Sequence, residues 1–492
     1  MEVLLAGYNL DSTVIEELKQ KAGGREDITP ETLSASYARI SRDPRSIPEL
    51  REAARKEVEK TRRSNKAIIF KMGHHSVAEH AVFNFDILGI SRLALEEMEH
   101  FRLAAYTEKS QRYITLKDDF VIPEEINSSK HKDAFIKLVK EQNALYHELF
   151  GKLKEHVFKK HTDLAKDPKN QSLLEGWAKE DARYVTALAT EGQLGFTVNA
   201  RTLELLFRRF ASHELAEVRA LGKALFATVE KIAPSIILFK EANDYDQKTY
   251  PELVKLSKKY GKKTKANGGE VELIQVTEDP DNTTAAAILH SSSAMPFDEC
   301  IKTARAMKAE EKKDLFKTAC SHMEFYDKVL REFEYADMTF SLTISASCFA
   351  QLKRHRLASL TCQKYRPELG ITMPESIKEI KAEKEFNEII DKTNECYSKL
   401  LSISDTAAQY CLTNAHRRRV LFKMNAREFY HISRLREDNH AQWDIKNISA
   451  EMSRKAKKAM PLTMLLIGGK DNYPKLYEEV FGRPPKITNT GT

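Results

Sequence analysis

The sequence is poor in the features that mark secreted, membrane or zinc-binding proteins. All six cysteines lie in the second half and none forms a C-x-x-C pair, which argues against a disulfide framework and a zinc site. No apolar run reaches membrane-spanning length, and the opening MEVLLAGYNLDST has no basic segment followed by an apolar one. We therefore expect a cytoplasmic protein with reduced thiols and no membrane partner.

Charge of one sign is not in large excess either. The formal net charge is +7, and the basic residues are interleaved with acidic ones along 492 residues. This balance suits anionic small molecules at least as well as a polynucleotide, so a nucleic-acid partner is not expected. The run from His416 to Arg419 is a weak indication of RNA binding, and we interpret it instead as a solvated or phosphate-facing helix surface.

One module occurs twice in the chain. The segment EMEHFRLAAYTEKSQRYI in the first half aligns without a gap with QLKRHRLASLTCQKYRP in the second, placing His100 against Arg354 and Arg102 against Arg356. The motif Asn-Ala-Arg then recurs at 199–201 and 425–427. It follows 99 residues after the first triad and 71 after the second, so the first copy carries about 28 extra residues. We place them in the Lys-rich, helical stretch 130–179.

The repeat predicts two domains, 1–242 and 270–492, joined by a polar linker at 243–269 with a turn at Asn267-Gly268-Gly269. Each copy opens with a short strand candidate, 3–7 or 271–276. HAVFNFDILG and ADMTFSLTIS alternate apolar and polar residues as strands do, and the segments after Asn199 and Asn425 have helical periodicity. The expected fold is α+β and helix-rich, with a mixed or antiparallel sheet in each tandem copy.

Two basic segments indicate anion binding. Arg354-His355-Arg356 supplies fixed positive charge and planar donors suited to phosphate or a heterocycle, although a solvated helix end or a localisation-like cluster would also account for it. In the first copy, Ser110 and Arg112 stand together, and a hydroxyl beside an arginine can hold a phosphate group. An ordinary turn serine is the alternative for Ser110.

Two histidine-containing segments call for a similar choice. KMGHHSVAEHAVFNF places three histidines beside Glu79, but no second cluster with zinc-like spacing accompanies it. We expect structural histidines or a flavin or folate contact there, and no metal. In the second copy, Asn425, His431 and the Arg436/His440 pair can share one side of a helix and face one ligand, although a solvated helix face would explain the arginines equally well.

Together these motifs resemble the flavin-dependent thymidylate synthase family. That family's signature is R-H-R, then seven residues, then Ser, and the segments GHHSVAEH, SQRY and R-x-x-x-HAQW belong to the same pattern. The likeness covers most of both halves, as a tandem duplication. It implies FAD sites between neighbouring modules of a tetramer, one neighbour supplying the R-H-R side and the other the Ser side.

Measured against the family pattern, the two copies have lost complementary residues. The second copy keeps Gln351, Arg354, His355, Arg356, Asn425, Arg427, His431 and Arg436. At five of these positions the first copy has Glu97, His100, Phe101, Leu205 and either Phe210 or, after a one-residue shift, Arg209. The first copy keeps Glu108, Ser110, Gln111, Arg112 and Arg183, whereas the second has Cys362, Lys364, Tyr365, Arg366 and Gln409. This pattern favours one hybrid site per chain, built from both copies.

The resemblance implies reductive methylation of dUMP to dTMP, with methylenetetrahydrofolate and NADPH as co-substrates and FAD as cofactor. By the same resemblance, the substrate is held by Glu108, Ser110, Gln111, Arg112, Arg183, Gln351, Arg354 and Arg436. Arg436 would also stabilise charge developing on the pyrimidine. FAD would be held by His74, Ser76, Arg354, His355, Arg356, Asn425, Arg427 and His431.

Three departures leave other functions open. Thr107 and Thr361 stand where the family usually has Asn, and Ala105 replaces a usual Ser. These changes are compatible with a catalytically silent flavin- or nucleotide-binding regulator. They are also compatible with a methylase of a modified uridine nucleotide or of RNA uracil.

The hybrid hypothesis predicts unequal effects at equivalent positions. Arg112→Ala and Arg354→Ala should each abolish dTMP formation, because each removes a retained group of the shared site. Arg366→Ala and His100→Ala, at the matching positions, should be much milder. Steady-state assays of the four variants check this, and equal losses at all four would count against sharing.

The family's tetramer predicts that two tandem chains form a homodimer with four modules. Light scattering on the active protein should therefore give the mass of two chains. A fully active monomer would contradict this expectation.

Overall fold

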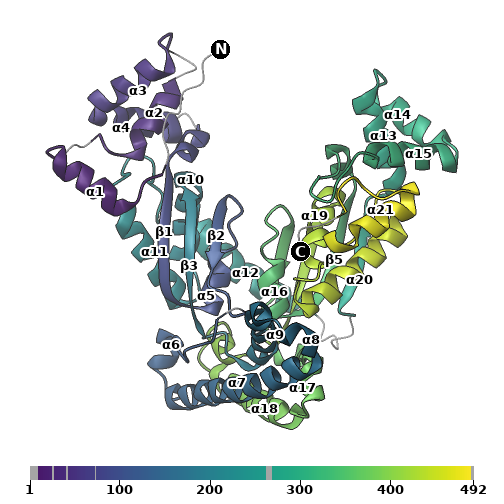
Figure 1. Cartoon of the computed structure of the whole chain (residues 1–492). Helices are drawn as coiled ribbons and strands as arrows, with labels where there is room; N and C mark the ends of the chain where they lie inside the picture. The colour runs from purple at the N-terminus through teal and green to yellow at the C-terminus, as the bar shows by residue number, and fades with distance from the viewer. Residues whose placement is uncertain are drawn as a thin grey trace. The chain divides into compact units, whose positions relative to one another are not determined.

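The chain forms two helix-rich compact units, each with its own antiparallel sheet, which confirms the α+β class. The computed structural model describes residues 9–24, 27–39, 43–71, 74–112, 114–261 and 269–488. The first unit comprises Met1–Ile90, Leu103–Lys109 and Gly192–Lys262, and the second comprises Ser91–Arg102, Ser110–Glu191 and Lys263–Thr492 (Figure 1). The second unit therefore contains parts of both sequence repeats. The domain boundaries 1–242 and 270–492 stay a prediction.

The first unit has a three-stranded sheet in the order β1-β3-β2. Its strands are β1 (Val82–Ser91), β2 (Ala104–Glu108) and β3 (Glu191–Asn199), so the strand predicted from HAVFNFDILG is confirmed. Phe85 and Tyr106 each stack on Phe196, with ring centroids 5.9 and 5.3 Å apart, which joins the three strands through aromatic contacts. The helical segments are α1 (Ser12–Lys21), α2 (Pro30–Arg39), α3 (Ile47–Lys56), α4 (Val58–Lys66), η1 (Ala67–Lys71), η2 (His75–His80), α10 (Ala200–Ala211), α11 (Ala216–Val229) and α12 (Asp244–Tyr260).

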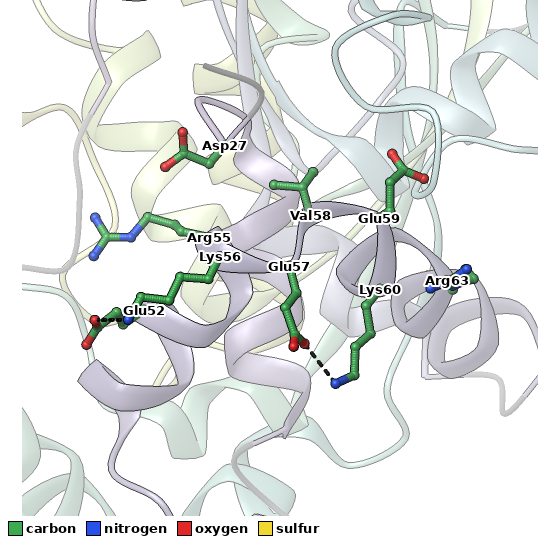
Figure 2. Close-up of a pocket in the computed structure, with 9 residues that line it drawn as sticks. All are labelled: Asp27, Glu52, Arg55, Lys56, Glu57, Val58, Glu59, Lys60 and Arg63. Carbon is green, nitrogen blue, oxygen red and sulfur yellow. Dashed lines mark ion pairs between the residues drawn. The ribbon is translucent and has the colours of Figure 1, made fainter. Parts of the chain in front are cut away.

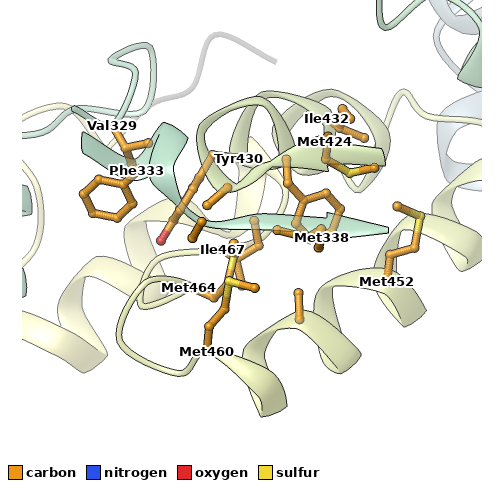
Figure 3. Packing of buried hydrophobic residues seen from close by; sticks show 14 of the residues in the cluster. Val329, Phe333, Met338, Met424, Tyr430, Ile432, Met452, Met460, Met464 and Ile467 are labelled. Carbon is orange, nitrogen blue, oxygen red and sulfur yellow. The ribbon is translucent and has the colours of Figure 1, made fainter. Parts of the chain in front are cut away.

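The second unit has a four-stranded sheet in the order β4-β5-β7-β6. Its strands are β4 (Val271–Val276), β5 (Asp337–Ser345), β6 (Ser359–Cys362) and β7 (Arg417–Asn425), which confirms the strands predicted at 271–276 and in ADMTFSLTIS. Met338 and Met424 of the sheet belong to one buried hydrophobic cluster with Met452 of α20 (Trp443–Ala459) and with Met460 and Met464, which follow α20 (Figure 3). The helices around this core are α13 (Pro280–Ser292), α14 (Phe297–Ala306), α15 (Ala309–Cys320), η5 (Arg331–Tyr335), α16 (Ala346–Leu352), α19 (Ala426–Arg436), α20 (Trp443–Ala459), η8 (Lys470–Asn472) and α21 (Tyr473–Phe481).

A helical layer within the second unit combines segments of both repeats. The Lys-rich stretch 130–179 is helical as predicted, and its long helix α7 (Lys132–Lys160) contacts α18 (Glu383–Leu400) of the second repeat. The buried Gln142 amide donates to Thr393 Oγ1 at 2.9 Å and to the Cys411 carbonyl at 3.0 Å. The other segments of this unit are α5 (Arg92–Met98), α6 (Glu124–Asn127), α8 (Thr162–Ala165), η3 (Pro168–Asn170), α9 (Gln171–Ala182), η4 (Arg183–Val185), η6 (Pro367–Leu369), α17 (Glu375–Glu379) and η7 (Ala407–Cys411).

The two sheets repeat one topology. The order β1-β3-β2 in the first repeat matches β5-β7-β6 in the second. The asparagines of the two Asn-Ala-Arg motifs have the same role, because Asn199 caps α10 and Asn425 caps α19 through their side-chain oxygens. Such a cap stabilises a helix by about 1 kcal/mol, which gives the recurring asparagine a structural reason.

A backbone bridge inside the second unit joins equivalent positions of the two repeats. Ala187 and Thr413 form an isolated antiparallel bridge, and each lies twelve residues before the asparagine of its Asn-Ala-Arg motif. The surrounding hydrogen bonds come in pairs related by exchange of the repeats: Leu188 N to Leu412 O (2.7 Å) with Asn414 N to Thr186 O (3.0 Å), and Ala189 N to Tyr410 O with Ala415 N to Tyr184 O (both 3.0 Å). The repeats thus associate here about a local two-fold axis, as subunits of a symmetric dimer do.

The basic run at 416–419 is not the helix surface that we predicted. Arg417 to Arg419 begin strand β7, and both His416 and Arg418 are buried. The Arg417 side chain donates to Thr372 Oγ1 at 2.9 Å and pairs with Glu270. Because these basic groups are held by protein partners, the run gives no support to RNA binding.

Other predictions fall partly or wholly outside the described residues. The strand candidate Val3–Gly7 lies outside them, as do Asn267 and Gly268 of the predicted turn, whereas Gly269 N donates to Glu272 Oε1 at 2.9 Å. Within the predicted linker 243–269, α12 forms a capped helix. Across the described ranges, no helix is both long and apolar enough to pass through a membrane.

His416 is a buried histidine with hydrogen-bond partners at both ring nitrogens. Its ring is fully buried, Nδ1 accepts a hydrogen bond from Thr413 N at 3.0 Å, and Nε2 lies 3.0 Å from Asn394 Oδ1. Burial lowers the pKa of His416 from 6.5 to about 4, so the folded protein holds the neutral ring.

We therefore predict a loss of stability as the pH falls from about 6.5 toward 4. In that window the unfolded chain binds the proton more tightly than the folded one, which removes roughly 3 kcal/mol. His416→Gln should lower stability at neutral pH but reduce the further loss on acidification. Thermal melts of both proteins at about pH 7.5 and about pH 4.5 test this. The same acid-induced shift in both would be inconsistent with the assignment.

Candidate active site

Four arginines from the two repeats gather in the second unit. Arg436 is the last residue of α19 and Arg354 follows α16, whereas Arg112 and Arg183 come from the first repeat. Burial, together with the positive charges of Arg354 and Arg112, lowers the pKa of Arg436 to about 10. Arg112 also acts on Arg183, whose pKa is lowered mainly by burial. Sequence-predicted residues of both copies therefore lie within electrostatic reach of one another.

Arg112 is held in place from two sides. Its Nε lies 2.8 Å from Glu180 Oε2, and its Nη2 donates to the His440 carbonyl at 3.0 Å. Its backbone N–H donates to Ser110 Oγ at 3.1 Å, so Ser110 does form the turn that we considered as its alternative role. Beyond that turn, Gln111 Oε1 accepts a hydrogen bond from Asn414 Nδ2 at 3.2 Å, which ties this loop to the second repeat.

We expected His440 and Arg436 to share one face of a helix, but they do not. Helix α19 ends at Arg436, and His440 lies in the following turn. Its contribution to the cluster is the backbone carbonyl that holds Arg112.

The R-H-R motif and the end of α19 form a connected group. Arg436 Nε donates to His355 Nε2 at 2.9 Å and Arg436 Nη2 donates to the Gln351 carbonyl at 3.1 Å. Burial and the neighbouring Arg436 and His431 lower the pKa of His355 well below its ordinary value. A neutral ring that accepts at Nε2 carries its proton on Nδ1, the atom 4.0 Å from Glu428 Oε1.

Gln351 also carries a polar atom that could meet a ligand. Its amide nitrogen contacts Gln442 Oε1 at 3.4 Å. The amide oxygen is buried and has no hydrogen-bond partner. A buried acceptor of this kind costs free energy unless a donor reaches it.

Several residues predicted to bind the cofactor make contacts within the protein. Arg427 Nε donates to the Val329 carbonyl at 2.9 Å and Arg427 Nη1 lies 3.0 Å from Glu334 Oε1. In the first unit its repeat equivalent Arg201 pairs with Glu79 at 2.5 Å. An ion pair with a glutamate thus recurs at this position in both copies. Arg356 Nη1 donates to the carbonyl of its own equivalent, Arg102, at 3.1 Å.

Three predicted site residues belong to the first unit. His74 and Ser76 lie at the start of η2 and are exposed, and Glu108 ends β2. Their roles stay predictions. Among the described residues, no group of three His, Cys, Asp or Glu side chains could hold a metal ion.

Each predicted substrate-binding residue has an equivalent in the opposite copy. Several of these equivalents are engaged in contacts with other protein side chains. We call Lys364, Tyr365, Arg366, Gln409, Glu97 and His100 the counterpart set. Tyr365 is fully buried and donates to Glu96 Oε1 at 2.9 Å, while Arg418 lies between the rings of Phe349 and Tyr365. Arg366 Nη2 pairs with Asp405 Oδ2 at 2.8 Å.

Sequence reasoning missed the buried acids that organise these groups. Glu180 holds Arg112, Glu96 holds Tyr365, and Glu99 lies 2.8 Å from both Lys353 and Arg354. The sequence did contain a signal for the Glu99 contact, because Glu99 and Lys353 occupy the same position of the repeat with opposite charge.

A separate open groove in the first unit contains none of the predicted residues. It has a volume of about 950 Å³ and is lined by charged side chains of α3 and α4 (Figure 2). Within it Glu52 pairs with Lys56 at 2.6 Å and Glu57 with Lys60 at 2.8 Å. Such exposed pairs along one helix are typical of a solvated surface.

A family model described as "Thymidylate synthase complementing protein" matches residues 26–235 and 272–462. The chain belongs to this family. The match in two segments is that of a tandem duplication, so the resemblance inferred from the motifs is confirmed. The family's flavin-dependent thymidylate synthases imply a flavin cofactor for the family.

Individual relatives match either one copy or most of the chain. A "Flavin-dependent thymidylate synthase" of Clostridium tetani is 29% identical over 215 residues, 43% of this chain and 82% of the relative. One from Sulfurisphaera tokodaii is 34% identical over 172 residues, 35% of this chain and 59% of the relative. A "UPF0159 protein" of Chlamydia muridarum is 24% identical over 408 residues, 79% of this chain and 77% of the relative. A match over 408 residues is long enough to include parts of both copies of this chain.

Proposed function

We propose that the chain catalyses flavin-dependent reductive methylation of dUMP to dTMP at one hybrid site. The observation that supports this most directly is that Arg112 of the first copy donates to the His440 carbonyl of the second, four residues after Arg436, and acts electrostatically on Arg436 and on Arg183. Each copy alone lacks part of this cluster. Together they provide the planar cationic donors that a nucleotide phosphate and a pyrimidine carbonyl require.

In this proposal the phosphate is bound by the first copy. Ser110, the Gln111 backbone and Arg112 form one turn, and Glu180 fixes the guanidinium of Arg112. Because that turn is already hydrogen-bonded, little ordering is needed when the anion binds. Glu108, at the end of β2, would complete the substrate contacts from this copy.

The base and ribose would be bound mainly by the second copy. Gln351 offers a buried amide oxygen, and Arg354 and Arg436 offer donors, with Arg183 added from the first copy. Since its pKa is about 10, Arg436 stays protonated at neutral pH. It can therefore stabilise negative charge that develops on the pyrimidine ring during attack. The neutral His355 accepts from Arg436 and holds its guanidinium in orientation.

The donor set also suits a flavin cofactor. FAD carries a pyrophosphate and a heterocycle, and Arg354, Arg356 and His431 offer charged and aromatic groups for both. Bound FAD would supply the hydride, with NADPH as reductant and methylenetetrahydrofolate as the one-carbon donor. Further contacts would come from His74, Ser76, His355, Asn425 and Arg427. A homodimer would assemble four modules from two chains.

The assay for this function is direct. The purified protein should show a flavin absorbance spectrum and form dTMP from dUMP, methylenetetrahydrofolate and NADPH. Titration should give one dUMP per chain. The counterpart set should bind none, because its member Tyr365 is fully buried and hydrogen-bonded to Glu96. Flavin binding without dTMP formation would favour a silent regulator, and two equivalent dUMP sites per chain would contradict the hybrid site.

A further inference from the structure

Glu99 is a buried carboxylate that joins the two repeats. It follows α5 of the first repeat, and its side chain is 1% exposed. Its Oε2 lies 2.8 Å from Lys353 Nζ, and its Oε1 lies 2.8 Å from Arg354 Nη1. A single acid of one copy therefore lies at ion-pair distance from two adjacent bases of the other.

This ion pair is possible only because the copies have diverged. Glu99 and Lys353 are equivalent positions, each directly before the triad position that is His100 in one copy and Arg354 in the other. Two identical copies would bring two carboxylates or two ammonium groups together near the local axis. Burying like charges is strongly unfavourable. A buried carboxylate at this position is therefore neutralised only when two unlike copies pair.

The two bases differ in exposure. The Lys353 side chain is 4% exposed, whereas that of Arg354 is 30% exposed. Lys353 offsets the carboxylate charge inside the protein, and Arg354 reaches from the same carboxylate to the arginine cluster. Repulsion from Arg436 would otherwise drive the Arg354 guanidinium away, since the two charges act on each other.

We infer that Glu99 is a positioning residue for nucleotide binding, which fixes Arg354 of the other copy against the repulsion of the neighbouring arginines. This inference rests on the proposed function. It assigns to the first copy a role beyond its phosphate-binding turn, because the first copy also orients the R-H-R side of the site.

The test compares two buried glutamates of the same segment. Glu99→Gln should weaken dUMP binding at least ten-fold, measured by calorimetry, and should raise KM for dUMP more than it lowers kcat. Glu96→Gln is the matched control, because Glu96 is equally buried but holds Tyr365 of the counterpart set and the neighbouring Arg418. It should change dUMP affinity less than two-fold.

A charge exchange separates positioning from simple stability. Glu99→Lys and Lys353→Glu should each lower the thermal midpoint, and the double variant should recover most of that loss. Its dUMP affinity should stay weak, because the carboxylate at position 353 can no longer hold Arg354 from the other repeat. Recovery of both stability and affinity would overturn the inference, as would unchanged affinity in Glu99→Gln. Wild-type protein that binds no dUMP would overturn the proposed function as well.

Discussion

The backbone bridge between Ala187 and Thr413 is the contact on which the arrangement of the second unit depends. Its hydrogen bonds occur in exchange-related pairs, so it keeps the geometry of a symmetric interface although the two sequences have diverged. Main-chain bonds do not depend on side-chain identity. This interface can therefore hold two repeats together while the residues around it change independently. The candidate site lies among segments that this bridge joins.

Around this symmetric backbone the charges are asymmetric. Glu99 faces Lys353, its own equivalent, and Arg92 Nη2 donates at 3.3 Å to the carbonyl of its equivalent, Ala346. The pair of opposite charges at Glu99 and Lys353 favours the association of unlike repeats over like ones. The copies also differ at the predicted substrate-binding positions. The retained residues include Arg112, Arg354 and Arg436, whereas the counterpart set includes the fully buried Tyr365.

Some residues of the predicted site also have a structural role, and that role is the same in both copies. Asn425 and Arg427 belong to the predicted cofactor set, yet their equivalents Asn199 and Arg201 make the same cap and the same kind of ion pair. Positions with a structural role stay alike in both copies. Arg112 and its equivalent Arg366 have different acidic partners, Glu180 and Asp405.

The sequence alone determined the family, the duplication, the α+β class and the strands and helices that carry the motifs, because these follow from residue order and local periodicity. It also determined that retained residues are complementary. It misplaced the run 416–419, since a buried β7 strand with paired arginines has the same letters as a basic surface. Only the tertiary structure decided that Arg112 of the first copy lies close enough to Arg436 of the second to lower its pKa, and that Glu99 lies against Arg354. Those contacts join residues more than two hundred positions apart, and their distances depend on packing about the local two-fold axis, which no local pattern encodes.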